Sequence, residues 1–158
     1  MATHTLRREQ FIPRPIEEVF PFFADARNLE TLTPPWLNFK ILTPSPIDMR
    51  AGVHLDYRLK WHGLPISWKT EILAWNPPHS FTDVQLRGPY GLWHHVHTFF
   101  SDPNGSRMVD VVTYRLPFGP LGDLAHATLV RRDLERVFDY RARVIASLFS
   151  PQSAGTRR

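Results

Sequence analysis

Two histidines and an aspartate carry the clearest chemical potential in the C-terminal half of the chain. His95 and His97 stand two residues apart in the run from Trp93 to Phe100. Asp110 follows after residues 102–105, whose sequence Asp-Pro-Asn-Gly is typical of a hairpin loop. An imidazole beside a carboxylate can orient a ligand or transfer protons, because the carboxylate fixes the tautomer of the ring and raises its basicity.

Antiparallel pairing across this loop predicts which side chains are neighbours. With residues 102–105 as the loop, the facing pairs are Phe99 with Met108, His97 with Asp110, His95 with Val112 and Trp93 with Tyr114. All eight share one face of the hairpin, and we place that face inward because it carries the larger rings. His97 and Asp110 then become the candidate catalytic residues.

Other strands should bring more rings and polar groups to the same inward surface. A concave apolar surface with a few convergent polar groups is the usual composition of a small-molecule site. The candidate ligand-binding residues are Tyr57, Trp61, Trp68, Asp83, Gln85, Trp93, His95, His97, Asp110, Tyr114 and Phe138.

The His97–Asp110 pair has three interpretations. A carboxylate in an apolar cavity must be paired, or its pKa rises until it is neutral. The pair can therefore be a ligand-orienting dyad, a general acid/base, or a polar plug that satisfies itself and only fixes the sheet register. Arg141, near the apolar stripe of the last helix, either anchors a carboxylate or packs its stem while its head reaches water, which is more usual.

A metal site must be weighed because the chain contains 8 histidines. His95 and His97 with Asp110 could form a site of two histidines and one carboxylate. Such spacing is common in strands by chance, and the sequence fixes no further ligand. We therefore expect no metal, and no other cofactor.

Composition and motifs exclude several classes of protein. With 158 residues, 42% hydrophobic and 22% charged, the chain is typical of one globular domain, and 13% aromatic residues favour a bulky core or a ring-lined cavity. The absence of cysteine excludes disulfides and thiolate sites. No P-loop, nucleophile elbow or dinucleotide fingerprint occurs. The net charge of +4 is modest and scattered, so we expect no nucleic-acid partner.

No apolar run approaches the roughly 20 residues of a membrane span, and residues 1–10 contain no signal-peptide core. We therefore expect a cytoplasmic protein, with peripheral membrane contact or a partner protein left open. We expect one domain over residues 1–150 and a flexible tail over 151–158.

The elements that position these residues follow from apolar periodicity and from Pro and Gly breaks. A first strand, Thr3 to Ile12, precedes a helix that starts near Pro15 and a short helix over 28–33. Alternation is clearest from Val53 to Trp61, where Leu55, Tyr57 and Leu59 share one side. More strands cover about 66–72, 81–86, 93–100 and 107–116, and one long helix covers about 121–149. We predict an α+β fold in which this helix covers one face of the sheet.

Several segments together resemble the START-like, or polyketide cyclase/dehydrase, superfamily, which includes Bet v 1-like proteins. The resembling segments are residues 12–20, 28–36, 88–90 with 93–99, 110–117 and 138–141. The resemblance implies a helix-grip fold, with a curved antiparallel sheet of about six or seven strands wrapped around the long C-terminal helix. Within the superfamily the chain looks most like small bacterial proteins related to coenzyme-Q-binding START proteins.

Three functions fit this resemblance, because the superfamily includes carriers, cyclases, hydrolases and stress proteins. The first is a carrier or sensor of a hydrophobic small molecule such as a quinone, isoprenoid, lipid or polyketide-like aromatic. The second is a cyclase/dehydrase- or hydrolase-type enzyme that uses His97–Asp110 or His95 as acid/base, with Tyr57 or Tyr114 as a hydrogen-bond donor. The third is a protein-interaction module that docks through the basic face of the last helix.

Overall fold

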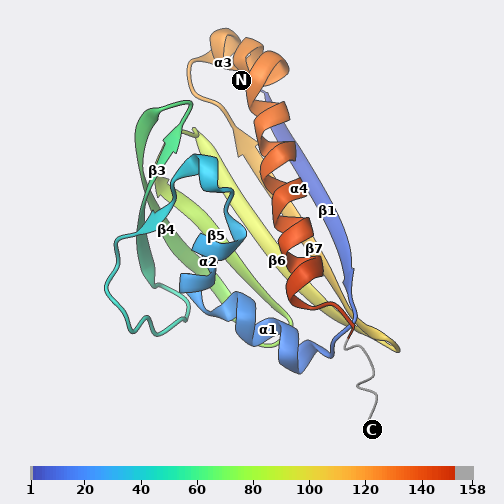
Figure 1. The fold of residues 1–158 in the computed structure, drawn as a ribbon. Coiled ribbons are helices and arrows are strands. Elements are labelled where there is room, and N and C mark those ends of the chain that lie inside the picture. Colours follow the sequence, from blue (N-terminus) through green and yellow to red (C-terminus); the bar gives the residue numbers. More distant parts are fainter. Residues whose placement is uncertain (1, 152–158) are drawn as a thin grey trace, which may run out of the picture.

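The computed structural model describes residues 2–151, and it shows a curved antiparallel sheet facing a long C-terminal helix (Figure 1). Apart from Pro151, the predicted flexible tail lies outside the described residues. The elements in chain order are β1 (Thr3–Ile12), α1 (Ile16–Ala24), η1 (Ala26–Asn28), α2 (Leu29–Leu32), η2 (Pro35–Leu37), β2 (Lys40–Ile41), β3 (His54–Trp61), β4 (Leu64–Asn76), β5 (Ser80–Arg87), β6 (Leu92–Asp102), β7 (Gly105–Arg115), α3 (Gly119–Ala125), η3 (His126–Val130) and α4 (Arg131–Leu148).

Seven strands form one sheet in the order β1-β7-β6-β5-β4-β3-β2, and every pairing is antiparallel. The predicted register of the β6–β7 hairpin is confirmed, with His97 opposite Asp110 and Trp93 opposite Tyr114. The loop is shorter than expected, because Asp102 still pairs with Gly105. The Trp93 face points inward as predicted: His95, His97 and Phe99 are buried, whereas Phe100 on the other face is exposed.

The C-terminal helix is continuous from Gly119 to Leu148, two residues longer at its start than predicted. It is not one regular α-helix, since the segment η3 has π-helical hydrogen bonding. A π-turn inserts one residue into the helical repeat and shifts the faces of the two flanking segments. The sequence periodicity of α4 alone could not reveal this insertion.

The buried apolar side chains form three clusters on the inner side of the sheet. The first cluster joins α1 to β6, β7 and the C-terminal part of α4, and it includes Phe99, Met108 and Ile145. The second cluster joins the part of β7 that follows Asp110 to an earlier part of α4, through Val112 and Phe138. The third lies on β3 and β4 with part of η1. Along β7, Asp110 falls between Met108 of the first cluster and Val112 of the second, so a polar layer separates the two.

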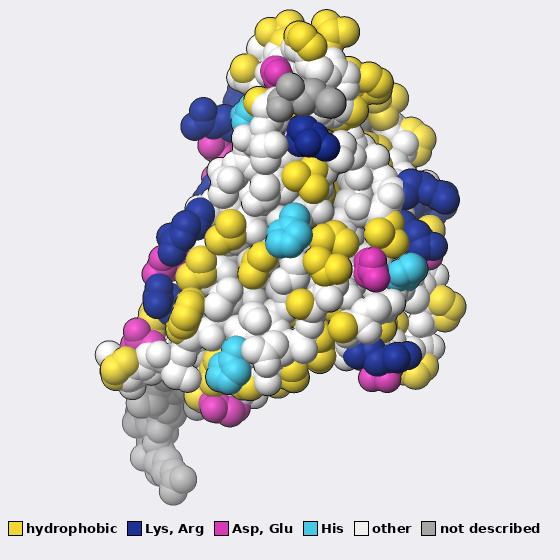
Figure 2. Space-filling model, turned by 180° about the vertical axis from the view of Figure 1, so that it is seen from behind, with side chains coloured by type: hydrophobic (Ala, Val, Ile, Leu, Met, Phe, Trp, Pro, Cys, Tyr) yellow, Lys and Arg dark blue, Asp and Glu magenta, His cyan; other side chains and the backbone are white. Residues whose placement is uncertain are grey.

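The outer side of the sheet is mixed in character. Figure 2 shows this side with hydrophobic, charged and histidine side chains interspersed, and with hydrophobic side chains gathered at the end where α3 lies. In and just before α3, Phe118, Leu121 and Leu124 are 81%, 73% and 61% exposed. Among the described helices, none is long and apolar enough to cross a membrane.

Packing of α4 against the first cluster gives a direct test of the fold. Ile145 is fully buried, and truncation to Ala removes buried methylenes and leaves a cavity, so Ile145→Ala should lower the free energy of unfolding by about 2–5 kcal/mol in urea titrations. Leu148→Ala is the matched control on the same helix, because Leu148 is 49% exposed, and it should change stability by less than about 0.5 kcal/mol. Equal effects of the two substitutions would contradict the packing described here.

Candidate functional site

A cavity of about 730 Å³ lies between the inner side of the sheet and the helices. This volume falls in the range of about 300–1,000 Å³ that is usual for small-molecule sites. Rings make up much of its wall: Trp68, Tyr90 and Trp93 pack against one another, with centroid distances of 4.8 to 5.6 Å. The opposite wall includes Leu134 and Phe138 of α4.

The hairpin between β3 and β4 is tied to α4 beside the cavity. Asp133 accepts a hydrogen bond from Trp61 Nε1 at 2.8 Å, and its Oδ2 also lies 2.7 Å from His62 Nε2. Phe118 and Leu121 line the cavity as well as contacting solvent. The α3 end of the molecule is therefore where the cavity wall reaches the surface.

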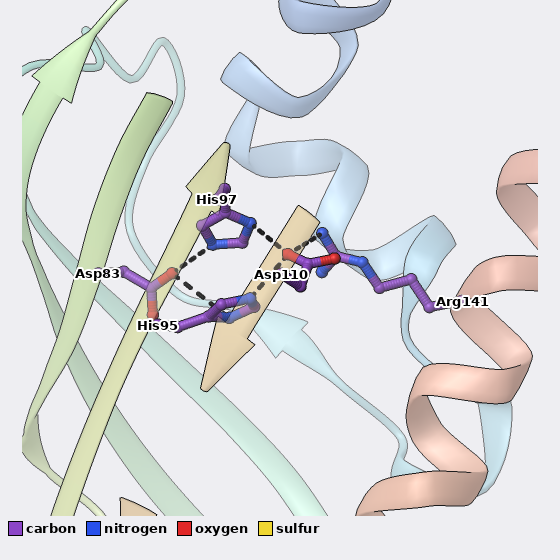
Figure 3. Close-up of polar contacts among 5 residues, drawn as sticks. All are labelled: Asp83, His95, His97, Asp110 and Arg141. Carbon is purple, nitrogen blue, oxygen red and sulfur yellow. Dashed lines mark hydrogen bonds and ion pairs between the residues drawn. The ribbon is translucent and has the colours of Figure 1, made fainter. Parts of the chain in front are cut away.

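Four titratable side chains meet on the cavity floor and form a polar quartet, Asp83, His95, His97 and Asp110 (Figure 3). The two imidazoles stack at a centroid distance of 3.7 Å, and each directs one nitrogen toward Asp83 and the other toward Asp110. The short hydrogen bonds are diagonal to the sheet register. His95 Nε2 lies 2.8 Å from Asp110 Oδ1, and His97 Nε2 lies 2.7 Å from Asp83 Oδ2.

The predicted partners His97 and Asp110 are also close, with 3.0 Å between Nδ1 and Oδ1. This contact lacks hydrogen-bond geometry, so Nδ1 has no hydrogen-bond partner among the described residues. Arg141 Nη2 lies 3.7 Å from Asp110 Oδ1, and its side chain is only 11% exposed. The guanidinium thus faces a buried carboxylate, and the more usual arrangement, with the head in water, does not apply.

Burial and the neighbouring charges shift the pKa values of the two carboxyl groups of the quartet in opposite directions. Burial alone would raise the pKa of Asp110, but Arg141 and the two imidazoles hold that pKa well below its usual range. Burial also opposes ionisation of Asp83, yet the hydrogen bond from His97 lowers its pKa. Both carboxylates are therefore ionised near neutral pH and accept hydrogen bonds, so His95 Nε2 and His97 Nε2 are the donors.

The two imidazoles differ in their protonation. Burial lowers the pKa of His95, and the neighbouring charge of His97 lowers it further. Burial also acts to lower the pKa of His97, but the carboxylates of Asp110 and Asp83 outweigh burial, so that the pKa of this ring is raised. One charged ring beside one neutral ring avoids the repulsion of two stacked imidazolium ions. The pKa shifts thus favour a positive charge on His97 over one on His95, and the hydrogen bond to Asp110 places a proton on His95 Nε2.

Comparison with known proteins places the chain in a family. Residues 3–146 match the family described as polyketide cyclase/dehydrase and lipid transport. The chain belongs to this family. Members of this family generally bind hydrophobic ligands. No curated protein matches the sequence.

Solved structures show the same fold at low sequence identity. Protein CV1439 from Chromobacterium violaceum superposes with a TM-score of 0.72 at 16% identity, covering 94% of this chain and 98% of that one. Ginseng major latex-like protein 151 from Panax ginseng superposes with a TM-score of 0.68 at 12% identity, covering 94% of this chain and 99% of that one. Ara h 8.0201 superposes with a TM-score of 0.62 at 17% identity, covering 92% of this chain and 99% of that one. These likenesses confirm the predicted helix-grip fold, and the family match confirms the predicted polyketide cyclase/dehydrase resemblance.

The structure brings most of the predicted site residues to the cavity. Those that line it are Tyr57, Trp61, Trp68, Asp83, Trp93, His95, His97 and Phe138. Three others do not. Asp110 lies behind the imidazoles, Gln85 instead hydrogen-bonds the backbone of Tyr90, and Tyr114 places its hydroxyl 2.7 Å from His126 Nε2.

Among the cavity residues absent from the predicted set, Arg141 and Asp133 contact predicted site residues, Asp110 and Trp61 respectively. Arg141 was expected either to anchor a carboxylate or to pack its stem, and Asp133 was not among the candidate ligand-binding residues. Both lie on α4, and both line the cavity. A carboxylate or guanidinium on the cavity side of an amphipathic helix is the signal that could have identified them.

Asp110 and Arg141 should be coupled energetically. Removing one member of a buried ion pair leaves the other uncompensated, so Asp110→Asn and Arg141→Met should each destabilise the fold by about 3 kcal/mol. The double variant should lose at least about 1 kcal/mol less than the sum, as measured by urea unfolding. Asp139→Asn, which breaks the half-exposed pair with Arg8, is the control and should cost about 1 kcal/mol or less. Additive losses for Asp110 and Arg141 would contradict this coupling.

Proposed function

We propose that the protein binds and carries a hydrophobic small molecule that bears a polar group, such as a quinone, isoprenoid, lipid or polyketide-like aromatic. The observation that carries the proposal is the ring-lined cavity of about 730 Å³ with one polar cluster on its floor. The apolar walls take the body of the ligand, and His97 with Asp83 hydrogen-bonds its polar group. A cytoplasmic location and a coenzyme-Q-like ligand are part of this proposal.

A second feature of the wall supports a ligand with a hydrogen-bond acceptor. The indole Nε1 of Trp68 is buried on the cavity side of β4 and has no hydrogen-bond partner among the described residues. Buried donors are nearly always paired, and an unpaired one loses the free energy of its hydration. An oxygen atom on the bound molecule would satisfy this donor.

Filling the cavity should abolish binding without disturbing the fold. Leu59 and Ile66 are register partners on the inner side of β3 and β4, and both line the cavity. The double substitution Leu59→Trp/Ile66→Trp should weaken binding of 1-anilinonaphthalene-8-sulfonate at least about tenfold, roughly 1.4 kcal/mol, in fluorescence titrations.

The matched control is Arg58→Trp/Ser67→Trp, because these residues are register partners on the exposed outer side of the same strands. This variant should bind the dye with the affinity of the unmodified protein. If both double variants bind equally well, or if the unmodified protein binds no dye, the cavity is not the binding site.

The His97–Asp83 contact favours a second candidate, an enzyme of the cyclase/dehydrase type. An imidazole hydrogen-bonded to a carboxylate beside an apolar cavity can polarise a carbonyl and move a proton from the adjacent carbon. The family description includes cyclases and dehydrases as well as lipid transport.

Proton exchange separates the enzyme from the carrier. An acid/base pair at His97 should accelerate exchange of the methyl protons of 2-acetylnaphthalene into D₂O, by about 10²-fold or more over buffer, as followed by NMR. His97→Phe should remove the acceleration and still bind the ketone. His94→Phe, on the opposite face of β6, should leave it unchanged. Binding without accelerated exchange in the unmodified protein would leave the carrier as the function.

A further inference from the structure

Asp83, His95 and His97 bring three ligand-type atoms together, all within 4.8 Å of one another. His97 Nε2 lies 2.7 Å from Asp83 Oδ2, and His95 Nδ1 lies 3.8 Å from the same oxygen. We propose that these three side chains bind a divalent first-row transition-metal ion on the cavity floor. The proposal goes beyond the carriage of a hydrophobic molecule, and it revises the expectation that no metal binds.

The donor set has the chemistry of such a site. Two imidazole nitrogens and one carboxylate oxygen suit zinc, iron and cobalt, whereas magnesium and calcium prefer oxygen ligands throughout. The sequence paired His95 and His97 with Asp110 as the carboxylate. The structure assigns the carboxylate to Asp83 instead, because Asp83 lines the cavity and Asp110 lies on the far side of both rings.

Asp110 occupies the place of an outer-shell carboxylate. Metal-binding histidines usually donate their second N–H to a carboxylate or carbonyl, which fixes the ring and increases its basicity. His95 Nε2 donates to Asp110 Oδ1 at 2.8 Å, and His97 Nδ1 lies 3.0 Å from that same oxygen. Arg141 adds a positive charge behind this carboxylate. Asp110 thus holds the His95 ring by a hydrogen bond and faces His97 Nδ1 without one, and the remaining nitrogen of each ring points toward Asp83.

His95 Nδ1 faces Asp83 without a hydrogen bond between the two side chains. The distance from Nδ1 to Asp83 Oδ2 is 3.8 Å, which is too long for a hydrogen bond, whereas Nε2 on the other side of the ring lies 2.8 Å from Asp110 Oδ1. A metal ion there would bind both atoms and would replace the proton between His97 and Asp83.

Three protein ligands leave at least one coordination position for another group. Because all three ligands line the cavity, that position is accessible to a molecule inside it. An oxygen atom of the bound molecule, or a water molecule, would complete the coordination. The metal would then select ligands that carry an oxygen donor at one end.

Metal titration of the untagged, chelator-treated protein tests the proposal. Zn²⁺ should bind with a stoichiometry of one in isothermal titration calorimetry, and Co²⁺ should give visible absorption bands. His95→Gln and Asp83→Asn should each weaken binding by about 100-fold or more, because each removes a ligand. His94→Gln is the matched control, since His94 is adjacent on β6 but points to the other face, and it should bind as the unmodified protein does.

Two further variants separate this site from alternatives. Asp110→Asn should weaken binding by about 10–100-fold, as expected of an outer-shell group. His126→Gln tests the other histidine pair, in which His4 and His126 stack at 3.4 Å, and it should have no effect. A chelator-treated protein that still binds the naphthalene dye keeps the cavity proposal independent of the metal.

The unmodified protein provides a test that does not depend on folding of the variants. Diffraction from cobalt-soaked crystals near the cobalt absorption edge should show one anomalous peak between Asp83, His95 and His97. Absence of stoichiometric Zn²⁺ binding, loss of binding in His126→Gln, or an anomalous peak elsewhere would each overturn the proposal.

Discussion

A single buried carboxylate, Asp110, determines the arrangement of the cavity floor. It is 2% exposed, and it remains ionised only because Arg141 and two imidazoles surround it. Both rings come from β6, and the guanidinium comes from α4. The distance between helix and sheet at this level is therefore set by electrostatics as well as by apolar packing.

The polar layer also explains why α4 and the sheet do not pack together completely and fill the cavity. Met108 and Ile145 pack on one side of the layer and Val112 and Phe138 on the other, so α4 is held against β7 at both ends of the quartet. The strands β3 to β5 curve away from this contact, and the cavity lies along them. An apolar residue in place of Asp110 would remove the need for Arg141 to face inward, and the two apolar clusters could merge.

Local patterns predicted most of the fold, and the site only in part. Alternation in β3 and the Asp-Pro-Asn-Gly loop carry their own register information, so the inward face of the hairpin and the pairing of His97 with Asp110 could be predicted. The diagonal hydrogen bonds could not, because they depend on where β5 sits beside β6. The turn between β5 and β6, which Gln85 braces through the backbone of Tyr90, leads into that register and leaves no periodic signal. The contact of Arg141 with Asp110 could be given only as one of two alternatives, because the π-turn determines which face of α4 meets the quartet.

Rings on the cavity wall keep the space open by packing on one another. Trp68 meets Trp93 nearly at a right angle, 88° between planes, and Tyr90 contacts both. Each ring is braced edge-to-face by its neighbour in a favourable quadrupolar arrangement, so none is free to turn into the void. His97 is also held by ring packing, here by stacking between two rings, with centroid distances of 4.1 Å to Phe81 and 3.7 Å to His95. A floor whose donors cannot rotate is preorganised, and a ligand or a metal ion binds it without the cost of ordering those side chains.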